Sequence, residues 1–127
     1  MEWRGKFTGG TPIDAAKVAL GQRQWPWITD EYWSFLGQVG WGPIGGDSFY
    51  SGPVTLHSIG VHDGPPGFIA IGDDMAGFWF GFMPQRGDSV VGVYRARWEK
   101  RWVIEDQEMG FAAFMAHRAS APAEDDL

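Results

Sequence analysis

The pattern of apolar and polar residues is clearest in residues 67–84, where two short apolar runs flank a polar turn. The first run begins at Phe68, and in the second run phenylalanines alternate with other residues. Asp73, Asp74 and several glycines lie between the runs, and these residue types tolerate the left-handed conformations of tight turns. The pattern therefore predicts a β-hairpin, and we expect this hairpin to lie at the centre of a sheet.

Three segments have the apolar spacing of helices. Residues 13–20 are expected to form a short helix that Asp14 caps and Gly21 ends. A second helix is expected after Thr29, because apolar residues follow at i, i+3, i+4 and i+7: Tyr32, Phe35, Leu36 and Val39. A third helix is expected over residues 107–118, with an apolar stripe of three residues: Phe111, Phe114 and Met115.

The remaining segments predict strands joined by short connections. We expect strands near residues 54–59, 90–94 and 102–104, a glycine-rich connection at residues 40–46, and a turn over residues 95–101. Strands joined by short turns must be mostly antiparallel, because a parallel crossover needs a dozen or more residues. The order of elements predicts an α+β fold, in which helices pack against one face of a mostly antiparallel sheet.

The composition fits one domain of 127 residues without internal repeats. The chain has 8 Trp, 9 Phe and 19 Gly, so large aromatic side chains provide the buried surface and glycines allow tight bends. Residues 1–12 are expected to be an extended arm that packs Trp3 and Phe7 onto the domain. Residues 119–127 are expected to be a flexible acidic tail.

Charge and cysteine content restrict the function further. The net charge of −6 opposes nonspecific binding to nucleic acid and suits a basic protein partner. The absence of cysteine excludes disulfides, thiolate zinc sites and a cysteine nucleophile. The N-terminus lacks the apolar core of a secretory signal, and no apolar run is long enough to cross a membrane. We therefore expect a cytoplasmic protein without membrane contact.

The acidic pair Asp73 and Asp74 is the strongest candidate for catalytic chemistry. With His57, His62 or Asp63 it could bind a metal ion or act as a general acid and base. The simpler interpretation is that carboxylates in a glycine-flanked turn bond nearby backbone amides. The histidines lack the spacing of a metal-binding helix, and the chain contains neither a G-x-S-x-G elbow nor a phosphate loop. We expect no catalysis, metal or cofactor.

Aromatic side chains suggest a binding surface. Six tryptophans cannot share one buried face, so one or two should be exposed: Trp25, Trp27, Trp33, Trp41, Trp79 and Trp98. Exposed tryptophans anchor protein partners and also form platforms for sugars. A basic and aromatic segment could stack single-stranded nucleic acid, although the net charge makes a solvated hairpin tip the better interpretation: Arg95, Arg97, Trp98, Lys100, Arg101 and Trp102.

Three patches resemble the SUKH superfamily, which includes bacterial immunity proteins of polymorphic toxin systems and relatives of fungal cell-wall regulators. The first patch runs from Ala19-Leu20-Gly21 through Trp25-Pro26 to Tyr32, Phe35 and Leu36. The second is the apolar run from Phe68 with Gly72-Asp73-Asp74, Gly77 and Gly81-Phe82. The third joins Val103-Ile104-Glu105-Asp106 to Phe111, Phe114 and Met115. One departure is Gly40-Trp41-Gly42, where the family often has Asn-Gly-Gly.

The resemblance implies a SUKH-like fold and a noncatalytic domain that binds and neutralises a cognate toxin of the nuclease or deaminase type. Such a toxin would be a basic protein, which an acidic surface attracts. Candidate partner-binding residues are Asp47, Asp73, Asp74, Trp41 and Trp79. The alternative is a small-ligand or carbohydrate-binding module, and a third possibility is a hydrolase that uses Asp73, Asp74 and a histidine.

Overall fold

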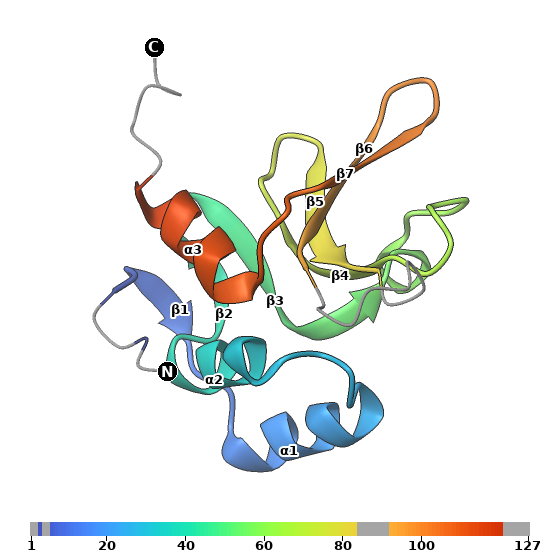
Figure 1. The fold of residues 1–127 in the computed structure, drawn as a ribbon. Helices are drawn as coiled ribbons and strands as arrows, with labels where there is room; N and C mark the ends of the chain where they lie inside the picture. The colour runs from blue at the N-terminus through green and yellow to red at the C-terminus, as the bar shows by residue number, and fades with distance from the viewer. Residues whose placement is uncertain (1–2, 4–5, 84–91, 121–127) are drawn as a thin grey trace.

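A computed structural model describes residue 3, residues 6–83 and residues 92–120. It confirms the α+β fold: three α-helices accompany one antiparallel sheet of seven strands (Figure 1). The strands are β1 (Gly9–Thr11), β2 (Trp41–Ile44), β3 (Asp47–Thr55), β4 (Ile69–Asp73), β5 (Phe78–Phe82), β6 (Tyr94–Trp98) and β7 (Trp102–Asp106). The helices are α1 (Ala15–Gln24), α2 (Asp30–Gln38) and α3 (Phe111–Ser120), with the 3-10 turn η1 (His57–Ile59) after β3.

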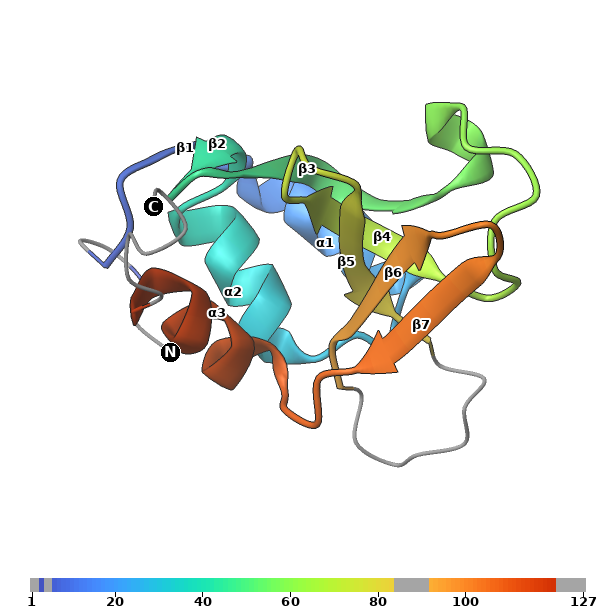
Figure 2. The same cartoon turned by 90° about the horizontal axis from the view of Figure 1, so that it is seen from above.

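The sheet is a meander in which spatial order follows chain order from β1 to β7. The predicted hairpin becomes β4 and β5, which lie in the middle of the sheet as expected. Ile69 pairs with Phe82 and Asp73 pairs with Trp79, so the polar turn closes the hairpin at the end of β4. The three helices gather on one side, whereas the β6–β7 hairpin extends away from them (Figures 1 and 2).

The main core lies between the helices and one face of the sheet. Phe35 of α2 and Phe111 of α3 are fully buried with ring centroids 5.2 Å apart, and Phe80 of β5 packs edge-on against Phe114 at 5.1 Å. Trp3 is buried against Phe35 at 5.4 Å, which confirms that the N-terminal arm packs an aromatic ring onto the domain. Aromatic rings therefore pack the helices against each other and against the sheet.

A second, smaller core lies on the opposite face of the sheet. Ala70 and Trp79 belong to it, whereas their chain neighbours Ile71 and Phe80 belong to the main core. Successive strand residues point to opposite faces, so both faces of the central hairpin are covered. The cover of the second face comes from the segment after β3 and from the last two strands, through Leu56, Val61, Phe68, Tyr94, Ala96, Trp102 and Ile104.

The first helix differs from its prediction at both ends. The helix begins at Ala15, two residues after the predicted start, and Asp14 caps it as predicted. The Asp14 side chain accepts a hydrogen bond from the Ala16 amide at 3.0 Å. Its predicted stop at Gly21 is wrong, because α1 continues to Gln24. A Cβ at position 21 would lie 2.6 Å from the Trp33 ring, so this glycine permits close contact between α1 and α2. Trp33, which falls outside the apolar stripe of α2, is buried for the same reason.

Two strands occupy segments that were expected to be connections. Residues 40–46, predicted to be a loop, contain β2 and the turn to β3, which begins at Asp47 and not near residue 54. Residues 95–101, predicted to be a turn, contain most of β6. Both strands have period-two burial, but glycine and proline hide it in β2 and charged residues hide it in β6.

The predictions near the C-terminus hold in part. Phe111, Phe114 and Met115 are buried as expected, but α3 begins at residue 111 and continues into the segment predicted to be a tail. Residues 90–91 of one predicted strand and residues 121–127 of the tail lie outside the described part of the chain. Thr29 precedes α2 as predicted, yet its side chain makes no capping hydrogen bond.

Candidate functional site

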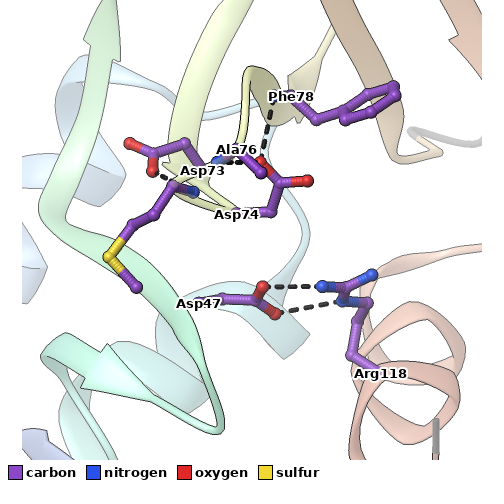
Figure 3. Close-up of polar contacts among 7 residues, drawn as sticks. Asp47, Asp73, Asp74, Ala76, Phe78 and Arg118 are labelled. Atoms are coloured by element: carbon purple, nitrogen blue, oxygen red, sulfur yellow. Dashed lines mark hydrogen bonds and ion pairs between the residues drawn. The ribbon is translucent and has the colours of Figure 1, made fainter. Parts of the chain in front are cut away.

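The turn between β4 and β5 is organised by the predicted acidic pair. The Asp73 carboxylate accepts a hydrogen bond from the Met75 amide at 2.8 Å. Asp74 Oδ1 accepts from the amides of Ala76 at 2.8 Å and Phe78 at 3.0 Å (Figure 3). Both carboxylates therefore bond local backbone, as the simpler sequence interpretation predicts, and fix the turn through neighbouring N–H groups.

The tip of this turn presents an apolar side chain to solvent. Met75 has 65% of its surface exposed, more than any other large apolar residue of the described chain. Its φ of 61° is left-handed, an uncommon conformation for a residue with a Cβ, and Gly77 follows with a φ of 103°. The hydrogen bonds of the two carboxylates hold this conformation. The result is a pre-ordered loop with a flexible thioether at its tip.

Tyr50 of β3 anchors Asp73 from the neighbouring strand. Its hydroxyl donates a 2.6 Å hydrogen bond to Asp73 Oδ2, so both oxygens of that carboxylate are engaged. Burial, followed by the hydrogen bond and the negative charge of Asp73, raises the pKa of Tyr50 above its usual range. The hydroxyl consequently remains a donor at physiological pH. Sequence reasoning did not select Tyr50 or Met75, although Met75 stands out as an apolar residue within a turn of Asp, Ala and Gly.

Three tryptophans form a row across β5, β6 and β7, on the face of the sheet that carries the second core. Trp79 of β5 lies 5.6 Å from Trp102 of β7, and Trp102 lies 5.8 Å from Trp98 at the end of β6. Trp102 Nε1 also donates to the backbone oxygen of Asp63 at 2.8 Å. Trp98 is 62% exposed, whereas the predicted anchor Trp79 is half-buried by its neighbours. Trp98 therefore offers the larger free aromatic surface.

Of the other predicted partner-binding residues, Trp41 lies away from this turn, whereas Asp47 lies beside it, because its neighbour Ser48 pairs with Asp73. Trp41 is 45% exposed, but it lies on β2, three strands from β5. Asp47 is buried and forms a two-pronged ion pair with Arg118 of α3, at 2.6 Å and 3.0 Å (Figure 3). The charge of Asp47 is thus neutralised inside the domain, where it joins the sheet to the last helix.

His57 and His62 lie at the opposite end of β4 from the acidic pair. Nδ1 of His57 lies 3.2 Å from Nδ1 of His62. A cavity of about 360 Å³ next to them is lined by Thr55, Leu56, His57, Val61, Asp63, Gly64, Pro65, Gly67, Phe68 and Ile69. The strand from Ile69 to Asp73 spans roughly 13 Å, at about 3.3 Å per residue. The fold therefore keeps His57 and His62 apart from Asp73 and Asp74, and no tryptophan lines this cavity.

Two of the basic residues of the β6–β7 hairpin, Arg95 and Arg97, make contacts with neighbouring side chains. Arg97 forms ion pairs with Glu99 at 2.6 Å and Glu105 at 2.7 Å. The guanidinium of Arg95 lies 4.0 Å from the centre of the Phe78 ring. Among the described residues, no three His, Asp or Glu side chains cluster in a way that could hold a metal ion.

Comparison of the chain with protein-family models, with curated proteins and with solved structures finds no match. None of the helices in the described part of the chain has the length and apolar character needed to span a bilayer. The geometry of the β4–β5 turn and the tryptophan row is therefore the basis for a functional proposal.

Proposed function

We propose that this chain is a noncatalytic protein-binding domain, a SUKH-like immunity protein that neutralises a cognate toxin in the cytoplasm of the producing cell. The observation that carries the proposal is the pre-ordered β4–β5 turn. Asp73 and Asp74 hold its backbone through three amide hydrogen bonds, while Met75 projects from it with 65% of its surface exposed. A loop that is ordered before binding loses little conformational entropy when a partner covers it.

The charge of the turn suits a basic partner. Asp73 and Asp74 place two carboxylates beside the exposed Met75, in a chain with a net charge of −6. Complementary charge accelerates association and orients the partner, while the apolar contact supplies most of the affinity. Toxins that act on nucleic acid carry basic surfaces because they contact phosphates. Coverage of such a surface blocks access to substrate without any chemical step.

The tryptophan row provides a second contact region. Trp98 is 62% exposed and lies next to Trp102, which connects it to Trp79. Exposed tryptophans beside charged residues are typical of the residues that dominate protein interfaces. We therefore assign the anchor role, which the sequence suggested for Trp79, to Trp98.

The alternative function, a small-ligand or carbohydrate-binding module, receives less support. Its most suitable site is the cavity beside His57 and Phe68, with a volume of about 360 Å³. A sugar site of the expected kind would place several tryptophans around a hollow, whereas Trp79, Trp98 and Trp102 form a row on the sheet. This alternative predicts a rise in melting temperature with added mono- or oligosaccharides.

Co-expression with a toxin tests the proposal. We expect a neighbouring gene to encode a large secreted protein, and the toxin to co-express is the C-terminal domain of that protein. The readout is survival of the host cell. We expect protection by the wild-type chain and loss of protection by Met75→Arg, which places positive charge at the tip of the turn. Leu20→Arg is the matched control, because Leu20 is also apolar and 58% exposed but lies on α1. Equal protection by both variants, or no protection by the wild type, contradicts the proposal.

A further inference from the structure

The last strand of the sheet has a free edge. β7 pairs with β6 on one side, and no strand of the described chain pairs with its other side. The opposite edge of the sheet, β1, is only three residues long, whereas β7 has five residues. A regular edge strand of this length presents unpaired N–H and C=O groups that can pair with another strand.

Two backbone hydrogen bonds define which groups of β7 face outward. The Glu99 amide donates to the Arg101 oxygen at 2.7 Å, and the Gln107 amide donates to the Val93 oxygen at 3.0 Å. In an antiparallel ladder, hydrogen-bonded and non-bonded pairs alternate. The odd-numbered residues of β7 therefore bond β6, and the even-numbered residues direct their N–H and C=O groups to the free edge: Trp102, Ile104 and Asp106.

The charges along β7 are arranged so that the strand is complementary to itself. Lys100 and Arg101 precede the strand, whereas Glu105, Asp106 and Glu108 lie at or beyond its end. A parallel copy would place like charges side by side. An antiparallel copy centred on Ile104 pairs Trp102 with Asp106 of the second copy. It also brings the turn before β7, which holds Lys100, to the segment after β7 of the second copy, which holds Glu108. Opposite charges then meet at both ends of the ladder.

We propose that β7 pairs with β7 of a second copy of this chain, which gives a twofold dimer with one sheet running through both subunits. Ile104 lies on the twofold axis, and the three outward-facing residues of each strand supply the hydrogen bonds between subunits. This interface is isologous, because the same strand serves both sides. It leaves the β4–β5 turn free and does not depend on the proposed toxin binding.

The register can be tested by sedimentation equilibrium of the full chain between about 1 and 500 µM, a range suited to a small interface. We expect a species with twice the mass of the 14.1 kDa chain. Lys100→Glu and Glu108→Lys should each weaken the dimer about tenfold or more by placing like charges opposite each other. The double variant should restore dimerisation to within about threefold of wild type, because the exchanged charges pair again.

Ile104→Pro tests the backbone pairing. Proline removes an N–H that faces the free edge, a position where edge strands tolerate it, so the β6–β7 ladder keeps its hydrogen bonds. We expect this variant to be monomeric with a wild-type circular dichroism spectrum. A wild-type chain that stays monomeric throughout, or a double charge variant no tighter than the single variants, overturns the proposal. These charge variants decide the outcome even if the proline variant does not fold.

Discussion

At the scale of single residues, Asp74 does the most to shape the proposed binding turn. Its Oδ1 accepts hydrogen bonds from two backbone amides, those of Ala76 and Phe78. Asp74→Ala leaves both amides without this acceptor, so we expect it to lower the free energy of unfolding by about 1–2 kcal/mol. Asp74→Asn retains an acceptor oxygen and should cost less than about half of that. Urea denaturation measures both values, and equal losses would show that charge rather than hydrogen bonding stabilises the turn.

Two helical glycines form a matched pair. A Cβ at Gly21 would lie 2.6 Å from the Trp33 ring, whereas a Cβ at Gly37 would find only a Val18 methyl group at 4.0 Å. Alanine is the better helix former by about 1 kcal/mol, so Gly37→Ala should be stabilising by up to that amount. Gly21→Ala should instead destabilise by about 1–3 kcal/mol, because the ring must move. Thermal or urea unfolding tests both, and stabilisation by Gly21→Ala would contradict the close helix contact.

Tyr32 carries a buried hydroxyl that has no hydrogen-bond partner among the described residues. A buried polar group without a partner is costly, so Tyr32→Phe should raise the free energy of unfolding by about 1 kcal/mol at pH 7. Burial also raises the pKa of Tyr32 above its usual range. The unfolded tyrosine loses its proton above about pH 10 while the folded one keeps it, so stability falls as pH rises beyond that point.

Above about pH 10, the free energy of unfolding should therefore fall less steeply with pH in the Tyr32→Phe variant than in the wild type. The two slopes should differ by about 1.4 kcal/mol per pH unit, which is the contribution of one tyrosine. Urea midpoints at pH 9 and pH 11 give the comparison. Parallel declines in the two proteins would show that Tyr32 ionises in the folded state as well.

At the scale of elements, one ion pair joins the last helix to the sheet. Asp47 at the start of β3 is buried, and Arg118 near the end of α3 reaches it with two hydrogen bonds. Asp47→Ala removes both of these hydrogen bonds and the opposite charge from Arg118. We expect the free energy of unfolding to fall by about 2–3 kcal/mol, near the low end for buried pairs because Arg118 is partly exposed. Glu99→Ala removes a surface partner of Arg97 and should change the urea midpoint little.

The elements that the sequence predicted well have a regular spacing of apolar residues. The β4–β5 hairpin and the buried stripes of α2 and α3 follow directly from the spacing of their aromatic residues. β2 and β6 were missed because glycine, proline and arginine occupy their alternate positions. The end of α1 was misplaced because Gly21 is required by contact with Trp33, which no local signal reveals.

Only the local part of the candidate site could be predicted from the sequence. Local turn chemistry was enough to predict that Asp73 and Asp74 bond backbone amides. The burial of Asp47 depends on Arg118, which is 71 residues away in the chain. Tyr50 approaches Asp73 through the pairing of β3 with β4, and that register is set by the whole sheet. Long-range pairings of this kind lie outside what residue spacing can predict.

At the scale of the whole molecule, the proposed binding regions belong to the sheet and its turns and not to the helices. The β4–β5 turn and Trp98 belong to the second half of the meander, whereas α1, α2 and α3 cover the other side of the sheet (Figures 1 and 2). The proposed dimer edge belongs to β7 and does not include the turn. One subunit can therefore contact a toxin through the turn while it pairs with a second subunit through the edge.

The most direct measurement is a titration of the purified toxin domain with this chain, with toxin activity as the readout. Neutralisation by binding predicts that activity falls linearly and reaches its minimum at one chain per toxin. Met75→Arg should shift or abolish this end point, while Leu20→Arg should leave it unchanged. Inhibition by far less than one equivalent, or no inhibition at any ratio, would contradict the account, because the first result requires turnover and the second excludes a neutralising complex.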